Sequence, residues 1–136
     1  MLKRISMCGL FLVMMLNMNA QNKIDVSKFP LNTINKNSSL QLVFYVSGDG
    51  GWNSFSQKIC AELSLKGYAI VCIDSKKYFW EQKTPEKFSQ DASDIIEYYL
   101  KAWDKDEFSI IGYSFGADAA AFLPSRISKT LQTKLK

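Results

Sequence analysis

The residues with the clearest chemistry lie at positions 112–116, which read Gly-Tyr-Ser-Phe-Gly. The apolar run Phe108–Ile111 precedes this pentapeptide, and an Ala-rich segment follows it. A strand, G-x-S-x-G and a helix in this order are typical of a nucleophile elbow, which lifts a serine hydroxyl above a sheet. Gly112 would let strand and helix approach, and Gly116 would remove a clash in the first helical turn. Ser114 is therefore the predicted nucleophile; a plain Gly-Ser turn is the alternative.

Such a serine needs a base. A serine hydroxyl is a weak nucleophile until an adjacent group, most often a histidine, accepts its proton. The sequence contains no histidine. In α/β-hydrolases the acidic residue and the histidine of the triad follow the serine along the chain, and only residues 117–136 follow the elbow here. We therefore expect the nucleophile half of a hydrolase site in a chain truncated before its triad is complete.

A glycine-rich loop, Ser-Gly-Asp-Gly-Gly-Trp at residues 47–52, follows the apolar run Leu40–Val46. In α/β-hydrolases the corresponding loop supplies one N–H of the oxyanion hole, and the residue after the nucleophile supplies the other. The predicted donors are the backbone N–H groups of Asp49 (or Gly50) and Phe115. A phosphate-binding loop is the rival interpretation, although no Lys-Ser/Thr pair follows and G-x-G-x-x-G is absent. A plain turn is the third.

Two acidic and two aromatic residues are further candidates, for substrate binding. Asp49 and Asp118 flank the predicted reaction centre, where a carboxylate would favour a substrate that carries ammonium groups. Asp118 could instead interact with the positive end of the elbow helix. Tyr78 and Trp80, in the run Tyr-Phe-Trp, either line the mouth of a pocket or cap the core, and the sequence favours neither.

The segments that must position these residues alternate between strand and helix. Strands are predicted at Leu40–Val46, Ala69–Ile73 and Phe108–Ile111, with a weaker edge strand at 29–34 and a turn at 35–39. Alternating strands and helices form βαβ units. The predicted fold is therefore α/β, a partial α/β-hydrolase fold with a mostly parallel sheet flanked by helices. Leu40–Val46 is expected between the other two strands, leaving Phe108–Ile111 as an unpaired apolar edge.

Two helices are predicted between these strands. The first has apolar residues at four-residue spacing, and Gly67 suits the position just after its end. The second begins at Thr84-Pro85, an N-cap followed by proline in the first turn. The apolar stripes of the two helices are Phe55, Ile59 and Leu63, and then Phe88, Ala92, Ile95, Ile96, Tyr99 and Trp103.

The first 20 residues have the layout of a secretory signal peptide. Lys3 and Arg4 precede the apolar run Ile5–Leu16, and Ala20 offers a small residue before Gln21. The run is shorter than the ~20 residues that a membrane span needs. We predict an exported, periplasmic protein in which residues 21–136 form one domain; an uncleaved anchor is the alternative.

The charge distribution and the cysteines argue against a nucleic-acid-binding protein and against a metal site. Without the leader, 15 basic and 13 acidic residues remain, dispersed along the chain, so no basic stripe indicates nucleic acid binding. Cys60 and Cys72 are predicted to be unpaired thiols, although export would permit a disulfide. They have no histidine or further cysteine beside them to build a metal site. No metal or cofactor is predicted.

Several segments resemble the bacterial virulence protein VirJ/AcvB family, and the resemblance covers about residues 40–130. The elbow motif extends to Gly-Tyr-Ser-Phe-Gly-Ala-Asp, far more specific than G-x-S-x-G alone. The segments are Ser47–Trp52, Tyr78–Trp80, Thr84–Glu86, Gly112–Asp118 and the tail Phe122–Arg126.

The resemblance implies a function. Members of that family are exported α/β-hydrolase-fold proteins, linked to virulence, to type IV secretion and to hydrolysis of lysyl-phosphatidylglycerol at the membrane surface. It implies that Ser114 is the nucleophile, that the substrate is an aminoacylated phospholipid or another ester, and that secretion-system proteins are partners. The family's Asp and His lie further along than Lys136. The rival function is a non-catalytic periplasmic accessory, or a degenerate fragment, that keeps the fold.

Overall fold

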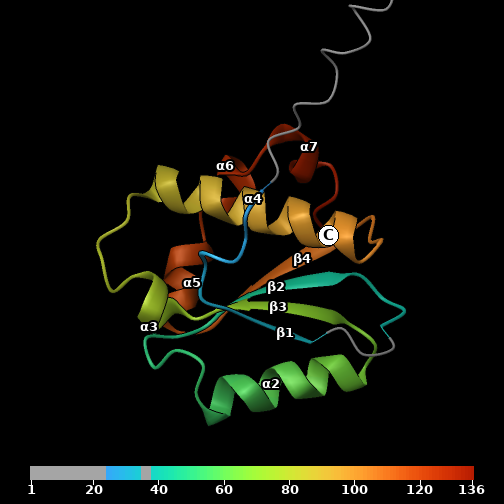
Figure 1. The fold of residues 1–136 in the computed structure, drawn as a ribbon, viewed down its shortest axis with the longest axis horizontal. Helices are drawn as coiled ribbons and strands as arrows, with labels where there is room; N and C mark the ends of the chain where they lie inside the picture. Colours follow the sequence, from blue (N-terminus) through green and yellow to red (C-terminus); the bar gives the residue numbers. More distant parts are fainter. Residues whose placement is uncertain (1–23, 35–37) are drawn as a thin grey trace, which may run out of the picture.

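The computed structural model describes residues 24–34 and 38–136 (Figure 1). The predicted signal peptide and most of the predicted turn at 35–39 lie outside the described residues.

The strands of the described residues form one sheet. They are β1 (Leu31–Ile34), β2 (Leu42–Val46), β3 (Ala69–Ile73) and β4 (Phe108–Gly112), in the order β1-β3-β2-β4. The strand β3 is parallel to β2 and antiparallel to β1, and β2 is parallel to β4. The predicted central place of β2 is confirmed. Every residue of β2 is buried, as expected for a strand covered by helices on both faces.

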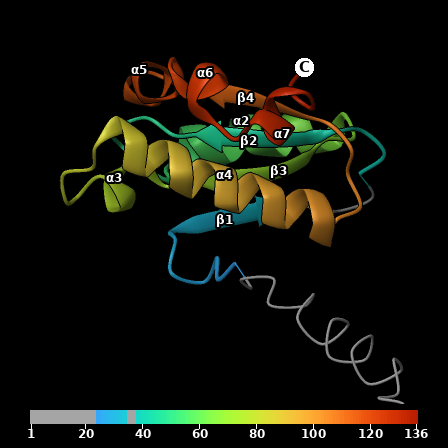
Figure 2. The same cartoon turned by 90° about the horizontal axis from the view of Figure 1, so that it is seen from above.

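The strands β1 and β4 form the two edges of the sheet, on opposite sides of it in Figure 2. The edge formed by β4 is less open than the sequence predicts, because Phe108 forms an isolated parallel bridge with Leu135. The Phe108 N–H donates to the Lys134 carbonyl at 3.1 Å, and the Lys136 N–H donates to the Phe108 carbonyl at 2.9 Å. The end of the described chain thus covers the start of β4. The rest of this strand has no further strand beside it among the described residues.

Helices cover both faces of the sheet (Figure 1). On one face α2 (Ser54–Leu65) packs over a small cluster that includes Val43, Tyr45 and Ile70. On the other, α4 (Pro85–Ala102), α6 (Leu123–Arg126) and α7 (Lys129–Gln132) enclose the larger core. The parallel strands and these helices confirm the predicted α/β class.

The predicted ends of the two long helices are confirmed. The Thr84 hydroxyl accepts a hydrogen bond from the Lys87 N–H, and Pro85 lies in the first turn of α4. Gly67 follows α2 with φ +97°. The Tyr68 N–H then donates to the Leu63 carbonyl at 3.2 Å, the hydrogen bond of a Schellman motif.

The structure adds three short helices that the sequence analysis did not predict. One is α3 (Ser75–Tyr78), in which the Asp74 carboxylate caps the N-terminus by accepting from the Lys77 N–H. The others are α6 and α7, each of four residues. The elbow helix α5 (Phe115–Ala120) is present but has only six residues. Helices of four residues are stabilised by packing against the rest of the protein. They are too short to show a repeating apolar spacing, so the sequence does not predict them.

Candidate active site

Ser114 occupies the turn between β4 and α5. Its φ of 52° and ψ of −126° are outside the conformations that a side chain readily adopts, and such a backbone costs roughly 1–3 kcal/mol. The strand β4 ends at Gly112 and the helix α5 begins at Phe115, so only Tyr113 and Ser114 join them. The backbone thus has the strained strand–turn–helix geometry expected of a nucleophile elbow.

The two glycines of the motif make this turn possible through close packing. A Cβ on Gly112 would lie 2.5 Å from the Gly116 carbonyl oxygen, so the predicted approach of strand and helix is confirmed. A Cβ on Gly116 would lie 2.2 Å from the Val46 carbonyl oxygen and 2.3 Å from that of Ser47. Gly116 therefore avoids a clash with the end of β2 and with the first residue of the glycine-rich loop, which the sequence did not predict.

The glycine-rich loop reaches the elbow. A Cβ on Gly48 would lie 3.5 Å from Ser114 Cβ and 3.4 Å from the Tyr113 carbonyl oxygen. Gly51, at φ +68°, folds so tightly against Asp74 that its own Cβ would be 2.4 Å from the Asp74 Oδ1. The structure thus brings together the two segments that the sequence analysis paired.

Hydrogen bonds from buried serines hold the loop in place. The Ser75 N–H donates to Ser47 Oγ at 2.9 Å, and Ser75 Oγ donates to the Ser47 carbonyl at 2.6 Å. Both serines are buried. Ser56 Oγ donates to the Gly51 carbonyl at 3.1 Å. The first residues of α3 and α2 therefore fix the two ends of the loop.

The predicted oxyanion donors are free to act. The N–H groups of Asp49 and Phe115 form no hydrogen bond within the described residues, whereas Gly51 N–H already donates to the Gly48 carbonyl. Donors without an intramolecular partner can bind a developing negative charge. Gly50 carries an equally free N–H, so the choice between Asp49 and Gly50 stays open.

Tyr78 lies in the core. Its exposed fraction is 5%, and its hydroxyl donates to the Asp91 carboxylate of α4 at 2.7 Å. Burial, followed by this hydrogen bond, raises the pKa of the Tyr78 hydroxyl. Lys87 neutralises the same carboxylate. Of the two interpretations of the aromatic run, the structure places Tyr78 in the core-capping one, where it anchors α3 to α4; Trp80 is 83% exposed.

Other aromatic rings flank Ser114. The Tyr113 ring lies 4.4 Å from that of Phe55 on α2, and the Phe115 ring lies 5.2 Å from that of Phe79 after α3, both measured between centroids. Phe55 was not predicted to be a site residue, whereas Phe79 lies in the aromatic run for which the pocket mouth and the core were both left open. The four-residue spacing placed Phe55 on the apolar stripe of its helix, yet its side chain, in the first turn of α2, is 44% exposed.

The acidic candidates are both exposed to solvent. Asp49 lies in the glycine-rich loop and Asp118 in the first turn of α5. Neither side chain forms an ion pair within the described residues. Their carboxylates are therefore available to a cation that approaches the elbow.

The two cysteines are free and buried, as predicted. Contact with the Cys60 thiol and burial raise the pKa of Cys72. Within residues 24–34 and 38–136, no cluster of three or more His, Cys, Asp or Glu side chains could hold a metal ion.

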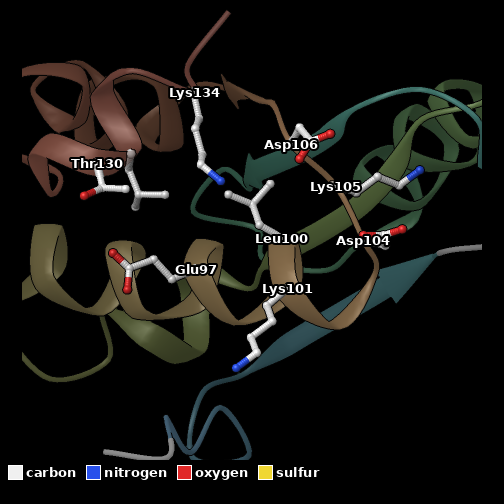
Figure 3. Close-up of a pocket in the computed structure, with 9 residues that line it drawn as sticks. Glu97, Leu100, Lys101, Asp104, Lys105, Asp106, Thr130 and Lys134 are labelled. Carbon is white, nitrogen blue, oxygen red and sulfur yellow. The ribbon is translucent and has the colours of Figure 1, made fainter. Parts of the chain in front are cut away.

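A charged pocket lies near the start of β4, whereas Ser114 follows the end of that strand. Figure 3 shows the residues that line the pocket. It has a volume of about 340 Å³ and opens between α4, the turn before β4 and α7. It contains none of the predicted site residues, and its mixed charges favour no ligand of one sign. The residues that line it are Glu97, Leu100, Lys101, Asp104, Lys105, Asp106, Thr130, Leu131 and Lys134. Among the described residues, no helix combines the length and apolar character of a membrane span.

The comparisons with known proteins can now be set beside this geometry. No curated protein matches the chain. Among solved structures, the chain is similar to a thioesterase domain, SrfTE, described as cyclizing the lipopeptide antibiotic surfactin. The identity is 18% and the TM-score 0.44, over 72% of this chain and 40% of that chain, so this chain spans less than half of the thioesterase domain.

The family model for VirJ, described as a bacterial virulence protein, matches residues 40–136. This range includes the glycine-rich loop, the elbow and every strand except β1. Because the match covers well over half of the chain, it shows the family. The chain belongs to the VirJ family of bacterial virulence proteins and has an α/β fold with a mostly parallel sheet flanked by helices.

Proposed function

We propose that this protein is an exported serine ester hydrolase whose substrate is an ester in a lipid head group. The observation that carries the proposal is the backbone of Ser114, held at φ 52° between two glycines that no larger residue could replace. A strained turn of this kind has no evident structural purpose, and strain concentrates at functional sites. The free N–H groups beside the serine add the second element of such a site.

The proposed chemistry is acyl transfer. Ser114 Oγ attacks the ester carbonyl and passes its proton to a general base, which later gives it to the leaving alcohol, while the Asp49 and Phe115 N–H groups bind the oxyanion. The tetrahedral intermediate collapses, the alcohol leaves with a proton, and water then hydrolyses the acyl-enzyme. The base is not a histidine of these residues, because residues 1–136 contain none.

The substrate is proposed from the family and from the charges near the elbow. Lysyl-phosphatidylglycerol carries ammonium groups on its acyl part, and the Asp49 and Asp118 carboxylates are exposed at the same end of the sheet. An opposite charge within ~4–6 Å favours a charged group over a neutral one. The membrane surface is then the place of reaction, and secretion-system proteins are the proposed partners.

A second candidate is a binding protein that uses the fold without catalysis. The absence of histidine favours it, because loss of triad members costs on the order of a million-fold in turnover. In this case the loop and the elbow would hold a ligand that is never cleaved.

Imidazole supplied in solution separates the two. We expect the chain alone to hydrolyse a nitrophenyl ester no faster than its Ser114→Ala variant, since no histidine activates the serine. With imidazole as an external base, a fluorophosphonate should add one phosphonyl group to Ser114, located by mass spectrometry of the peptide. The Ser114→Ala variant under the same conditions is the matched control.

Phosphonylation of Ser114 with imidazole, and none in the control, supports the hydrolase. If Ser114 stays unmodified in the folded protein under both conditions, the hydrolase proposal fails and the binding protein is favoured. Rapid Ser114-dependent hydrolysis without imidazole would instead overturn the expected lack of a base and indicate a lysine in that role.

A further inference from the structure

Two pairs of aromatic rings flank the predicted nucleophile. The residue before Ser114 contributes one ring to the first pair, Tyr113 with Phe55, whose centroids are 4.4 Å apart. The residue after it contributes one to the second pair, Phe115 with Phe79, at 5.2 Å. The serine therefore lies between the pairs along the chain.

The pairs come from opposite faces of the sheet. Phe55 lies in the first turn of α2, which covers the face with the smaller buried cluster. Phe79 follows α3 and packs against the larger cluster on the other face. Figure 1 shows α3 and α5 together at the end of the sheet, where the strand β4 meets the elbow. The two ring pairs thus join the elbow to helices on opposite faces of the sheet.

These rings keep much of their surface in water. The exposed fractions are 44% for Phe55, 46% for Tyr113 and 41% for Phe115. Of the seven large apolar residues exposed on the described chain, these three and Trp80 belong to segments that meet beside the elbow. Aromatic surface gathered in one place and left unburied marks a binding site.

We propose that the two ring pairs are the walls of the substrate-binding site and that they bind an apolar alkyl or acyl chain of the substrate. The inference rests on the proposed function in taking Ser114 as the reaction centre. None of the four ring side chains carries a charge, and flat apolar faces suit methylene groups. The exposed carboxylates of Asp49 and Asp118 remain for a cationic part. A lipid with a charged head and an apolar tail would satisfy both sets.

Binding of alkylphosphocholines tests the inference without any need for hydrolysis. Phosphocholine and its hexyl, octyl and decyl derivatives share one head group, so only the chain differs. Titrations followed by amide chemical shifts, each below the micelle-forming concentration, give the dissociation constants. We expect the affinity to rise roughly two- to fourfold with each methylene group. The shifts should concentrate on residues 52–56 and 112–116.

Two exposed apolar residues of α2 provide the matched variants. Phe55→Ser removes one wall and should weaken binding of the decyl compound about tenfold. Leu65→Ser removes an apolar side chain that is 82% exposed at the other end of the same helix, and should change it less than about twofold. Circular dichroism and thermal melting confirm that both variants are folded.

Affinity that does not depend on chain length, or equal losses in the two variants, overturns the inference. Strong binding of phosphocholine alone would assign the rings to a cation and also overturn it. Failure of the proposed function is distinguishable: chain-dependent binding at Phe55 with no phosphonylation of Ser114 leaves the ring site in place and removes only the hydrolase. Phosphonylation of Ser114 without chain-dependent binding would support the hydrolase and remove only the ring site.

Discussion

The glycine-rich loop and the elbow meet at the same end of the sheet but are held in place by opposite means. Buried hydrogen bonds position the loop, above all the two between Ser47 and Ser75. The elbow has no side-chain hydrogen bonds of this kind among the described residues; its hydrogen bonds join backbone groups, such as the Tyr113 N–H and the Val46 carbonyl at 3.1 Å. It is positioned by close packing, because Gly112 and Gly116 let backbone lie against backbone where a Cβ would not fit.

The difference explains which side of the site tolerates change. A hydrogen bond that is lost leaves a polar group unpaired but does not displace the chain, whereas a methyl group placed against a carbonyl must move one of the two segments. Loss of a serine hydroxyl beside the loop should therefore be tolerated better than an added methyl group at Gly112 or Gly116 of the elbow. The strained backbone of Ser114 is also held by close packing, because the tight contacts around the elbow keep the turn from relaxing.

The largest effect is expected for Gly116→Ala. The added methyl group would lie 2.2 Å from the Val46 carbonyl oxygen, so the elbow must move away from β2. We expect a loss of about 3 kcal/mol or more in the free energy of unfolding, measured by urea denaturation. Gly48→Ala is the control: its methyl group would meet atoms no closer than 3.3 Å, and the expected loss is under about 1 kcal/mol. Equal losses would refute packing as the constraint on the elbow.

A smaller effect is expected for Ser75→Ala on the loop side. The substitution leaves the buried Ser47 carbonyl without the hydroxyl donor that lies 2.6 Å away. The free energy of unfolding should fall by about 1–3 kcal/mol, and amide shifts should change at residues 47–51 but not at 112–116. Ser125→Ala removes an exposed hydroxyl-to-carbonyl hydrogen bond and should cost less than about 0.5 kcal/mol. Shifts that spread to the elbow would contradict independent positioning.

The smallest effect, and a gain, is expected when the strain at Ser114 is released. Glycine adopts a positive φ without a Cβ clash, so Ser114→Gly should be more stable than Ser114→Ala, which keeps the clash. The strain relief is partly offset by the greater freedom of glycine in the unfolded chain, which leaves a net difference of about 1 kcal/mol. Thermal melting of the two variants measures it. An alanine variant as stable as the glycine one would mean that the turn is not strained.

The local pattern of the sequence was enough to predict the strands and the two long helices. Buried strands such as Leu42–Val46 are continuous apolar runs, and the long helix after Thr84 has both a capping residue and an apolar stripe. These signals lie within a few residues of one another, so no distant contact is needed to read them. The same holds for the elbow, because the G-x-S-x-G motif lies between a strand and a helix.

Contacts between distant segments decided the rest. The Tyr78 hydroxyl is buried and donates a hydrogen bond to Asp91 on the next helix. Phe55 remains 44% exposed although it lies on the apolar stripe of α2. The bridge from Phe108 to Leu135 joins residues that no periodicity relates. Likewise, the carbonyls of Val46 and Ser47, far from Gly116 in the sequence, leave no room for a Cβ at that position. The sequence alone determined the α/β class, the elbow and the family resemblance. Only the tertiary structure decided what surrounds Ser114, because packing between segments far apart in the chain leaves no local pattern.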